Sequence, residues 1–161
     1  MRRGAAFLPT WPRNLRGGDP GMIDQRTAPY AALLLRVSLG VLFLVHAGLK
    51  LFAFTPAGTA QFFASLGLPP AMGYFTIAWE IGGGVALILG LWARIAALCM
   101  IPDLLGAIAL VHARVGFFFT DAGGGWEYPG LWATALLVLA LSGDGKWAIR
   151  STRSSSSTSP Y

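Results

Sequence analysis

The 161-residue chain is 55% hydrophobic and only 12% charged, which is too little polar surface for a water-soluble globule. Its formal charge of +5 comes mainly from basic residues near the two ends, and no basic helix with interleaved aromatic residues indicates nucleic-acid binding. The single cysteine, Cys99, excludes an internal disulfide, a CxxC redox pair and multi-cysteine metal ligation within this chain. Any redox chemistry would therefore need a bound cofactor or a partner.

The two ends of the chain have the composition of tails. Residues 1–27 contain several glycines, prolines and arginines and no apolar run long enough for a signal peptide, so we expect a disordered cytoplasmic tail, with Met22 as an alternative start. Residues 151–161 are nearly all Ser and Thr and predict a second disordered tail. Residues 28–150 are then one membrane domain.

Four apolar blocks predict an all-α integral membrane four-helix bundle. The first block has about 20 residues and would be about 30 Å long as a helix, which matches the hydrocarbon thickness of a bilayer. Residues 59–66, in the loop after it, predict a short interfacial helix. The tight connection at 92–94 predicts that the second and third spans are antiparallel neighbours. The predicted spans are residues 30–49, 72–91, 95–111 and 129–147.

The orientation follows from the distribution of Lys and Arg. These residues are concentrated before the first span, between the second and third, and after the fourth. The opposite side holds only Arg114 and the boundary residue Lys50. The positive-inside bias therefore predicts that both termini are cytoplasmic.

Three ionisable residues lie deep in the predicted spans: Arg36, Glu80 and Asp103. Each costs at least ~2.5–3.5 kcal/mol to insert, so each needs a partner or a function. The helical rise places all three in the inner half to middle of the bundle. One interpretation is a buried ionic network in which one or both carboxylates neutralise Arg36 and fix helix packing. The other is a proton-handling or anion-binding site, because two acids and one base leave a spare carboxylate.

A second polar group is expected near the outer face. His46 and Lys50 are four residues apart and share one side of the first span, and His112 ends the third span at the same depth. The outer loop can bring Glu127 and Tyr128 close to them. These residues indicate a quinone or small-anion pocket in which the histidines exchange protons. The alternative is that Lys50 extends to water and both histidines are hydrated. The residues lack metal-ligand spacing, so no metal site is predicted.

The second span also carries a stripe of small residues at four-residue spacing. Such a stripe allows another helix backbone to approach closely, so it predicts helix packing rather than ligand binding. The adjacent glycine run is no phosphate loop, because no strand precedes it and no Lys-Ser/Thr follows it. The stripe consists of Ala78, Gly82, Ala86 and Gly90.

The pattern of these residues resembles the DoxX family of small bacterial membrane proteins. Glu80-Ile81-Gly82-Gly83, with Leu87 and Gly90, is similar to the second signature of the family, and the stretches 112–119 and 123–129 are similar to its third. The resemblance covers about residues 30–147, although the N-terminal tail is longer than is usual in the family. The first signature is carried by Arg36, Gly40, Phe43, His46, Gly48, Lys50 and Leu51.

The resemblance implies four membrane helices in a bacterial inner membrane, and it suggests functions linked to redox chemistry. Named members of the family include a membrane subunit associated with the oxidation of thiosulfate, in which a quinone accepts the electrons. Another is a membrane partner of a superoxide dismutase and a sulfurtransferase. The first hypothesis is therefore a membrane subunit or anchor for a soluble redox or sulfur-metabolism protein in a thiol-stress complex.

Two other functions stay open. One is a quinone-linked oxidoreductase subunit acting on a small sulfur anion, with Arg36 or Lys50 holding the anion and Glu80 or Asp103 taking protons. The other is a small-solute or proton transporter, which would need a homo-oligomer because four helices make a narrow bundle. The residues themselves establish no cofactor, and a quinone is the candidate that the resemblance suggests.

Overall fold

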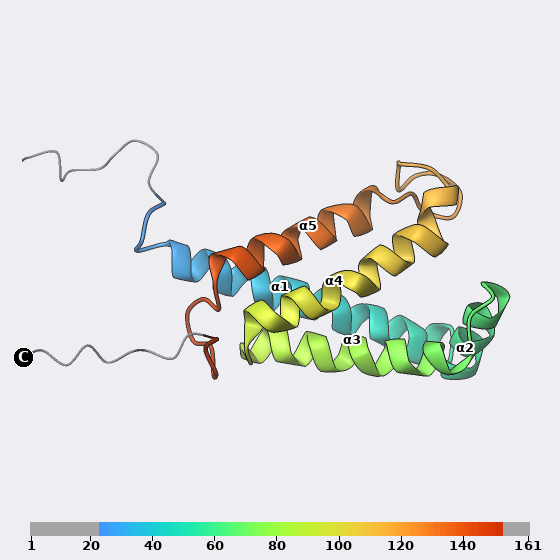
Figure 1. Cartoon of the computed structure of the whole chain (residues 1–161), viewed down its shortest axis with the longest axis horizontal. Helices are drawn as coiled ribbons and strands as arrows, with labels where there is room; N and C mark the ends of the chain where they lie inside the picture. The colour runs from blue at the N-terminus through green and yellow to red at the C-terminus, as the bar shows by residue number, and fades with distance from the viewer. Residues whose placement is uncertain (1–22, 153–161) are drawn as a thin grey trace, which may run out of the picture.

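The computed structural model describes residues 23–152, and all regular elements in that range are helical (Figure 1). An isolated β-bridge joins Leu91 to Arg150. Of the predicted tails at 1–27 and 151–161, residues 1–22 and 153–161 lie outside the described residues. The five α-helices are α1 (Ala28–Gly48), α2 (Pro56–Ser65), α3 (Ala71–Leu89), α4 (Ala93–Leu110) and α5 (Glu127–Ser142), with a π-helical turn η1 (Leu49–Ala53) after α1 and a 3-10 turn η2 (His112–Arg114) after α4.

Three helical segments of the described chain are long and apolar enough to cross a membrane. They are Ala28–Ala53, Ala71–Leu89 and Ala93–Arg114, whereas Glu127–Ser142 is a shorter apolar helix. With 16 residues, α5 is about 24 Å long, which is less than the hydrocarbon thickness. It ends before the predicted residue 147 because Gly143, with a φ of 108°, breaks the helical backbone.

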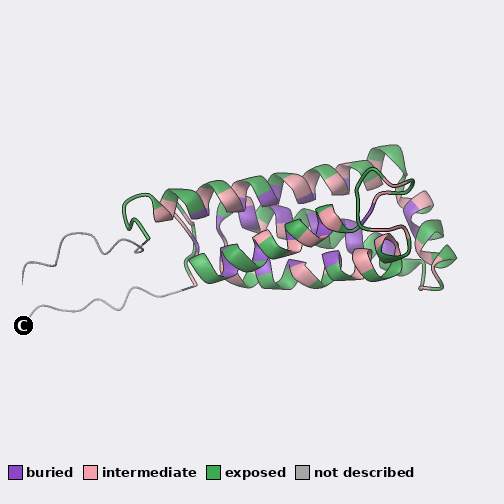
Figure 2. Ribbon diagram, turned by 90° about the horizontal axis from the view of Figure 1, so that it is seen from above, coloured by how far each residue is buried: buried purple, intermediate pink, exposed green. Residues whose placement is uncertain are grey.

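The long helices pack as antiparallel neighbours around one core (Figure 1). The main contacts are between α1 and α3 and between α4 and α5, and contacts of α3 with α4 and of α1 with α5 close the arrangement. The outward faces of the helices are exposed (Figure 2). Many of the exposed residues are large and apolar, and Leu34, Leu131 and Leu141 are each about 70% exposed. Such a surface suits lipid. The largest fully buried apolar side chains are Phe43, Leu87, Met100, Leu136 and Leu139.

The helices α1 and α3 approach each other closely at Gly40 and Gly84. A Cβ atom at Gly40 would lie 2.7 Å from the carbonyl oxygen of Gly84, and one at Gly84 would lie 2.9 Å from the carbonyl oxygen of Gly40. Both contacts are with backbone, which cannot move aside without separating the helices. Glycine at these two positions therefore sets the distance between α1 and α3.

The stripe of small residues predicted for packing has a different environment. Ala78, Gly82 and Ala86 line an open groove of about 240 Å³ between α3 and α4, and a Cβ atom at Gly82 would meet nothing within 4 Å. Gly90 follows the end of α3 as its left-handed cap, with a φ of 67°. The spacing identified a helix face made of small residues. It could not show that α1 packs instead against Gly84, on a different face of α3.

These two environments predict different effects on stability for two glycine substitutions. Gly40→Ala is expected to lower the free energy of unfolding by about 1–3 kcal/mol, because the new methyl group overpacks the α1–α3 contact. Gly82→Ala, which adds the same methyl group in open space, is the matched control and should retain wild-type stability. Thermal unfolding of the purified chain in one detergent would compare them. Equal melting temperatures for all three proteins would contradict this packing.

Candidate functional site

A buried ion pair links the turn η1, which follows α1, to the middle of α3. The Nζ atom of Lys50, in η1, lies 2.7 Å from both carboxylate oxygens of Glu80. The Glu80 side chain is 5% exposed and that of Lys50 is 20% exposed. Glu80 lies about 14 Å along α3 from the beginning of the helix, so Lys50 reaches into the bundle. The alternative that Lys50 extends to water is therefore wrong.

Two more titratable side chains face this pair. Asp103 of α4 interacts electrostatically with Lys50, His46 and Glu80. The Nδ1 atom of His46 lies 2.9 Å from the carbonyl oxygen of Leu42. A carbonyl only accepts hydrogen bonds, so Nδ1 carries the proton and Nε2 is the acceptor of the neutral ring. One ammonium group thus lies among two carboxylates and an imidazole.

The helix α5 adds Trp132, an aromatic residue whose indole N–H group has no acceptor in the described chain. The ring centroid of Trp132 lies 4.9 Å from that of His46, 4.4 Å from that of Phe43 and 6.0 Å from that of Tyr128. Trp132 is 5% exposed, and its buried Nε1–H group has no hydrogen-bond partner among residues 23–152. A buried donor without a partner costs about 1–3 kcal/mol. We call His46, Lys50, Glu80, Asp103 and Trp132 the polar cluster.

The other residues predicted for the outer site hold the outer loop. The Nδ1 atom of His112 lies 2.6 Å from the carbonyl oxygen of Gly124. A carboxylate oxygen of Glu127 accepts a hydrogen bond of 3.0 Å from the backbone N–H of Phe119. Of the five predicted residues, His46 and Lys50 belong to the polar cluster and Tyr128 contacts its tryptophan, whereas His112 and Glu127 have local partners.

Arg36 does not join the two carboxylates with which it was predicted to pair. Its guanidinium donates hydrogen bonds of 2.9 Å to the carbonyl of Leu87, 2.7 Å to that of Ile88 and 2.9 Å to that of Lys146. The first two carbonyls belong to the last turn of α3, where backbone acceptors lack helical partners and the helix dipole attracts a cation. Because Glu80 lies about 10 Å farther along α3, Arg36 is a clamp at the opposite end of the bundle.

A second clamp at that end is formed by Asp144. Its carboxylate accepts hydrogen bonds from the backbone N–H groups of Thr152 (2.8 Å) and Arg94 (3.3 Å) and from the hydroxyl groups of Ser151 and Thr152. Burial alone would raise the pKa of Asp144, but these hydrogen bonds outweigh it and leave the pKa below its ordinary value. The segment after α5 is therefore tied to the beginning of α4, and Ser151 belongs to this structure rather than to a free tail.

Trp132 is the residue of the cluster that sequence reasoning missed as a site residue. A tryptophan near the end of a membrane helix is typical of an interfacial aromatic belt, so its position carried no signal for a buried role. The two clamps were also missed. Neither carbonyl acceptors nor the return of the chain over α4 can be recognised from side-chain types.

Comparison with known proteins identifies a family and relatives that this chain resembles. The DoxX family model matches residues 31–113, which include all of the polar cluster except Trp132. The chain is 40% identical over 111 residues to CatD of Bacillus subtilis, whose name proposes an oxidoreductase, and the match covers 69% of this chain and 78% of CatD. It is 27% identical over 155 residues to an uncharacterized membrane protein of Mycobacterium tuberculosis, with 88% and 86% covered. No solved structure matches the chain.

The ion pair predicts a large difference between single and double substitutions. Lys50→Met leaves the Glu80 carboxylate buried without its cation and is expected to lower the free energy of unfolding by about 3 kcal/mol. Lys50→Met combined with Glu80→Gln removes both charges and should recover most of that loss. Lys146→Met is the control, because Lys146 is a cation over an exposed tyrosine ring. Equal unfolding temperatures in detergent for the single and double variants would show that the pair is not coupled.

The Asp144 clamp predicts a dependence of stability on pH. Because its pKa is lower in the folded chain, the clamp stabilises the fold fully above the ordinary Asp pKa of about 3.9, and this contribution is lost as pH falls through the folded pKa. Asp144→Asn should therefore lower the melting temperature near pH 7 and converge with the wild type in acid. Asp24→Asn, on an exposed turn, is the control. A difference that stays constant from pH 7 to strong acid would refute the assignment.

Proposed function

The chain belongs to the DoxX family of membrane proteins, and we propose that it is the membrane subunit of an oxidoreductase complex whose polar cluster binds the head group of a quinone. The observation that carries the proposal is the buried Nε1–H group of Trp132, which has no hydrogen-bond partner in the described chain. The indole ring that carries this group contacts His46, and His46 in turn interacts electrostatically with Asp103. A buried donor without a partner, beside several proton-exchanging groups, favours a ligand that accepts hydrogen bonds.

The residues of the cluster fit a quinone head group. When bound, a quinone supplies two carbonyl oxygens that accept hydrogen bonds and that take up two electrons and two protons on reduction. The indole N–H of Trp132 and the ammonium group of Lys50 are donors for such oxygens. The rings of Phe43 and Trp132 pack against each other, with centroids 4.4 Å apart, and they give the indole N–H apolar surroundings.

The charged side chains would hold and exchange the protons. Lys50 keeps the Glu80 carboxylate in the apolar bundle, and Asp103 is a second carboxylate within electrostatic reach of the same ammonium group. His46 adds a neutral acceptor at Nε2. Because Lys50 is partly exposed at the outer end of the first helix, we propose that protons pass between the cluster and the outer face, with both termini cytoplasmic and α5 as a fourth, shorter span.

The electrons would come from a soluble partner. The chain has one cysteine, so it cannot form a dithiol and disulfide couple of its own. A partner that oxidises a thiol or a small sulfur anion would supply the two electrons, and this chain would provide the membrane site at which they are received. The bacterial inner membrane is the proposed location, since quinones dissolve in its hydrocarbon layer.

Trp132→Phe tests the proposal directly. The variant removes the donor but keeps an aromatic ring, and it breaks no hydrogen bond within the described chain. We expect the Kd for a short-chain quinone to rise about tenfold, as for one lost buried hydrogen bond, while the melting temperature changes little. Calorimetric titration of the purified full chain in lipid nanodiscs measures the Kd. Trp79→Phe, on a 37% exposed tryptophan, is the matched control and should bind like the wild type.

Two results would contradict the proposal. One is a wild-type protein that binds no quinone in nanodiscs. The other is a Kd for Trp132→Phe equal to that of the wild type, because the unpartnered donor would then take no part in binding.

A further inference from the structure

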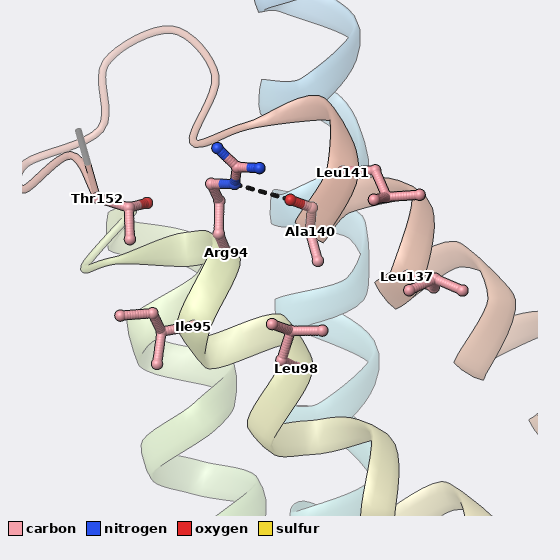
Figure 3. Close-up of a pocket in the computed structure, with 7 residues that line it drawn as sticks. All are labelled: Arg94, Ile95, Leu98, Leu137, Ala140, Leu141 and Thr152. Atoms are coloured by element: carbon pink, nitrogen blue, oxygen red, sulfur yellow. Dashed lines mark hydrogen bonds between the residues drawn. The ribbon is translucent and has the colours of Figure 1, made fainter.

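A groove of about 360 Å³ lies between α4 and α5 at the opposite end of the bundle from the polar cluster (Figure 3). Its walls are apolar and come from Ile95 and Leu98 of α4 and from Leu137 and Leu141 of α5. These four side chains are between 46% and 72% exposed, so the groove opens on the surface that faces lipid. Its volume is at the small end of ligand pockets and suits a section of a flexible chain rather than a helix.

Arg94 lies at the end of this groove where α4 begins. Its Nε atom donates a 2.8 Å hydrogen bond to the carbonyl of Ala140, a residue near the end of α5 that also lines the groove (Figure 3). The neighbouring carboxylate of Asp144 accepts from the backbone of Arg94 and from Ser151 and Thr152, and it makes no ion pair with the guanidinium. The two Nη atoms of Arg94 therefore have no protein acceptor among residues 23–152.

The surroundings of Arg94 are those of a membrane interface with positive charge. Lys146 and Arg150 lie at the same end, over the rings of Tyr30 and Trp92. Trp92 and Trp147 are 44% and 72% exposed, as expected for residues at the level of lipid head groups. By the helical rise, Leu98 lies about 6 Å deeper than Arg94 and thus within the hydrocarbon layer.

We propose that this groove binds one phospholipid with an anionic head group. The phosphate accepts charge-assisted hydrogen bonds from the two Nη atoms of Arg94, whose planar fork matches two phosphate oxygens. One acyl chain lies along Leu98, Leu137 and Leu141. The Nε hydrogen bond to Ala140 holds the guanidinium at the mouth of the groove before the lipid arrives, so the site is preorganised. The proposal does not depend on quinone binding at the polar cluster.

The test uses the full chain, delipidated in mild detergent, and counts bound lipid by native mass spectrometry. Phosphatidylglycerol is titrated against phosphatidylcholine with the same acyl chains. We expect one phosphatidylglycerol to stay bound, and Arg94→Gln to weaken its retention about tenfold, as for the loss of a charged hydrogen-bonding group. Arg150→Gln is the matched control, because it removes a cation at the same end but outside the groove, and it should retain the lipid.

A second variant keeps the proposal testable if Arg94→Gln fails to fold. Leu98→Trp fills the groove from a half-exposed position and should displace the lipid while leaving Arg94 intact. Inorganic phosphate, added alone in excess, should not compete, since it has no chain for the groove. Equal retention by the wild type and both groove variants, equal binding of the two lipids, or displacement by inorganic phosphate would each overturn the proposal.

Discussion

In a bilayer no water is available inside the chain's apolar envelope, so each buried polar group must find its partner within the protein. The two Nη atoms of Arg36 meet this constraint by binding the carbonyls at the end of α3 and that of Lys146, whereas its Nε has no partner in the described chain. Arg36 thereby satisfies acceptors that the end of a helix leaves free, and it ties α1 to both α3 and the segment after α5. The arrangement of the helices at this end depends on that single side chain, which is 1% exposed.

The half of the bundle that holds the polar cluster also leaves buried polar groups without a full set of partners. Lys50 and Glu80 neutralise each other, but Asp103 remains a second carboxylate near one ammonium group, and the Trp132 N–H has no acceptor in the described chain. Packing alone gives no reason to retain groups that cost free energy when buried. Each end of the bundle retains one buried N–H group without a partner in the described chain, Nε of Arg36 and Nε1 of Trp132. Only the Trp132 group lies beside several proton-exchanging side chains, and for this reason we assign binding to the polar cluster and architecture to Arg36.

Much of the helical framework could be predicted from the sequence, because hydrophobic blocks and helix lengths respond to the bilayer directly. The short helix predicted at 59–66 corresponds to α2, and a tight connection does join α3 to α4, although it lies at residues 90–92 rather than at the predicted 92–94. The pairing of charges could not be predicted, since helical rise gives the depth of a residue but neither its rotation about the bundle nor its backbone acceptors. Arg36 was therefore predicted to pair with Glu80 or Asp103, although its partners are carbonyls.

The end of α5 is a second feature that the sequence could not predict. Apolar residues alone do not reveal where a short helix stops, and the glycines after Ser142 end α5 so that the chain can return over the beginning of α4. That return depends on the Asp144 carboxylate, which accepts hydrogen bonds from Ser151 and Thr152. These two donors lie in a segment whose composition is typical of a tail. A single buried carboxylate thus converts part of an apparent tail into the wall of a groove.

The short helix α5 also connects the two proposed ligand sites while keeping them independent. Trp132 lies about 8 Å from the beginning of α5, and Leu137 lies about 8 Å from its end. Residues five apart on a helix are rotated by about 140°. Trp132 accordingly faces the core at 5% exposure, whereas Leu137 faces outward at 46%. Because the two proposed sites use different faces of α5, any coupling between them would have to pass through movement of α5 as a rigid unit.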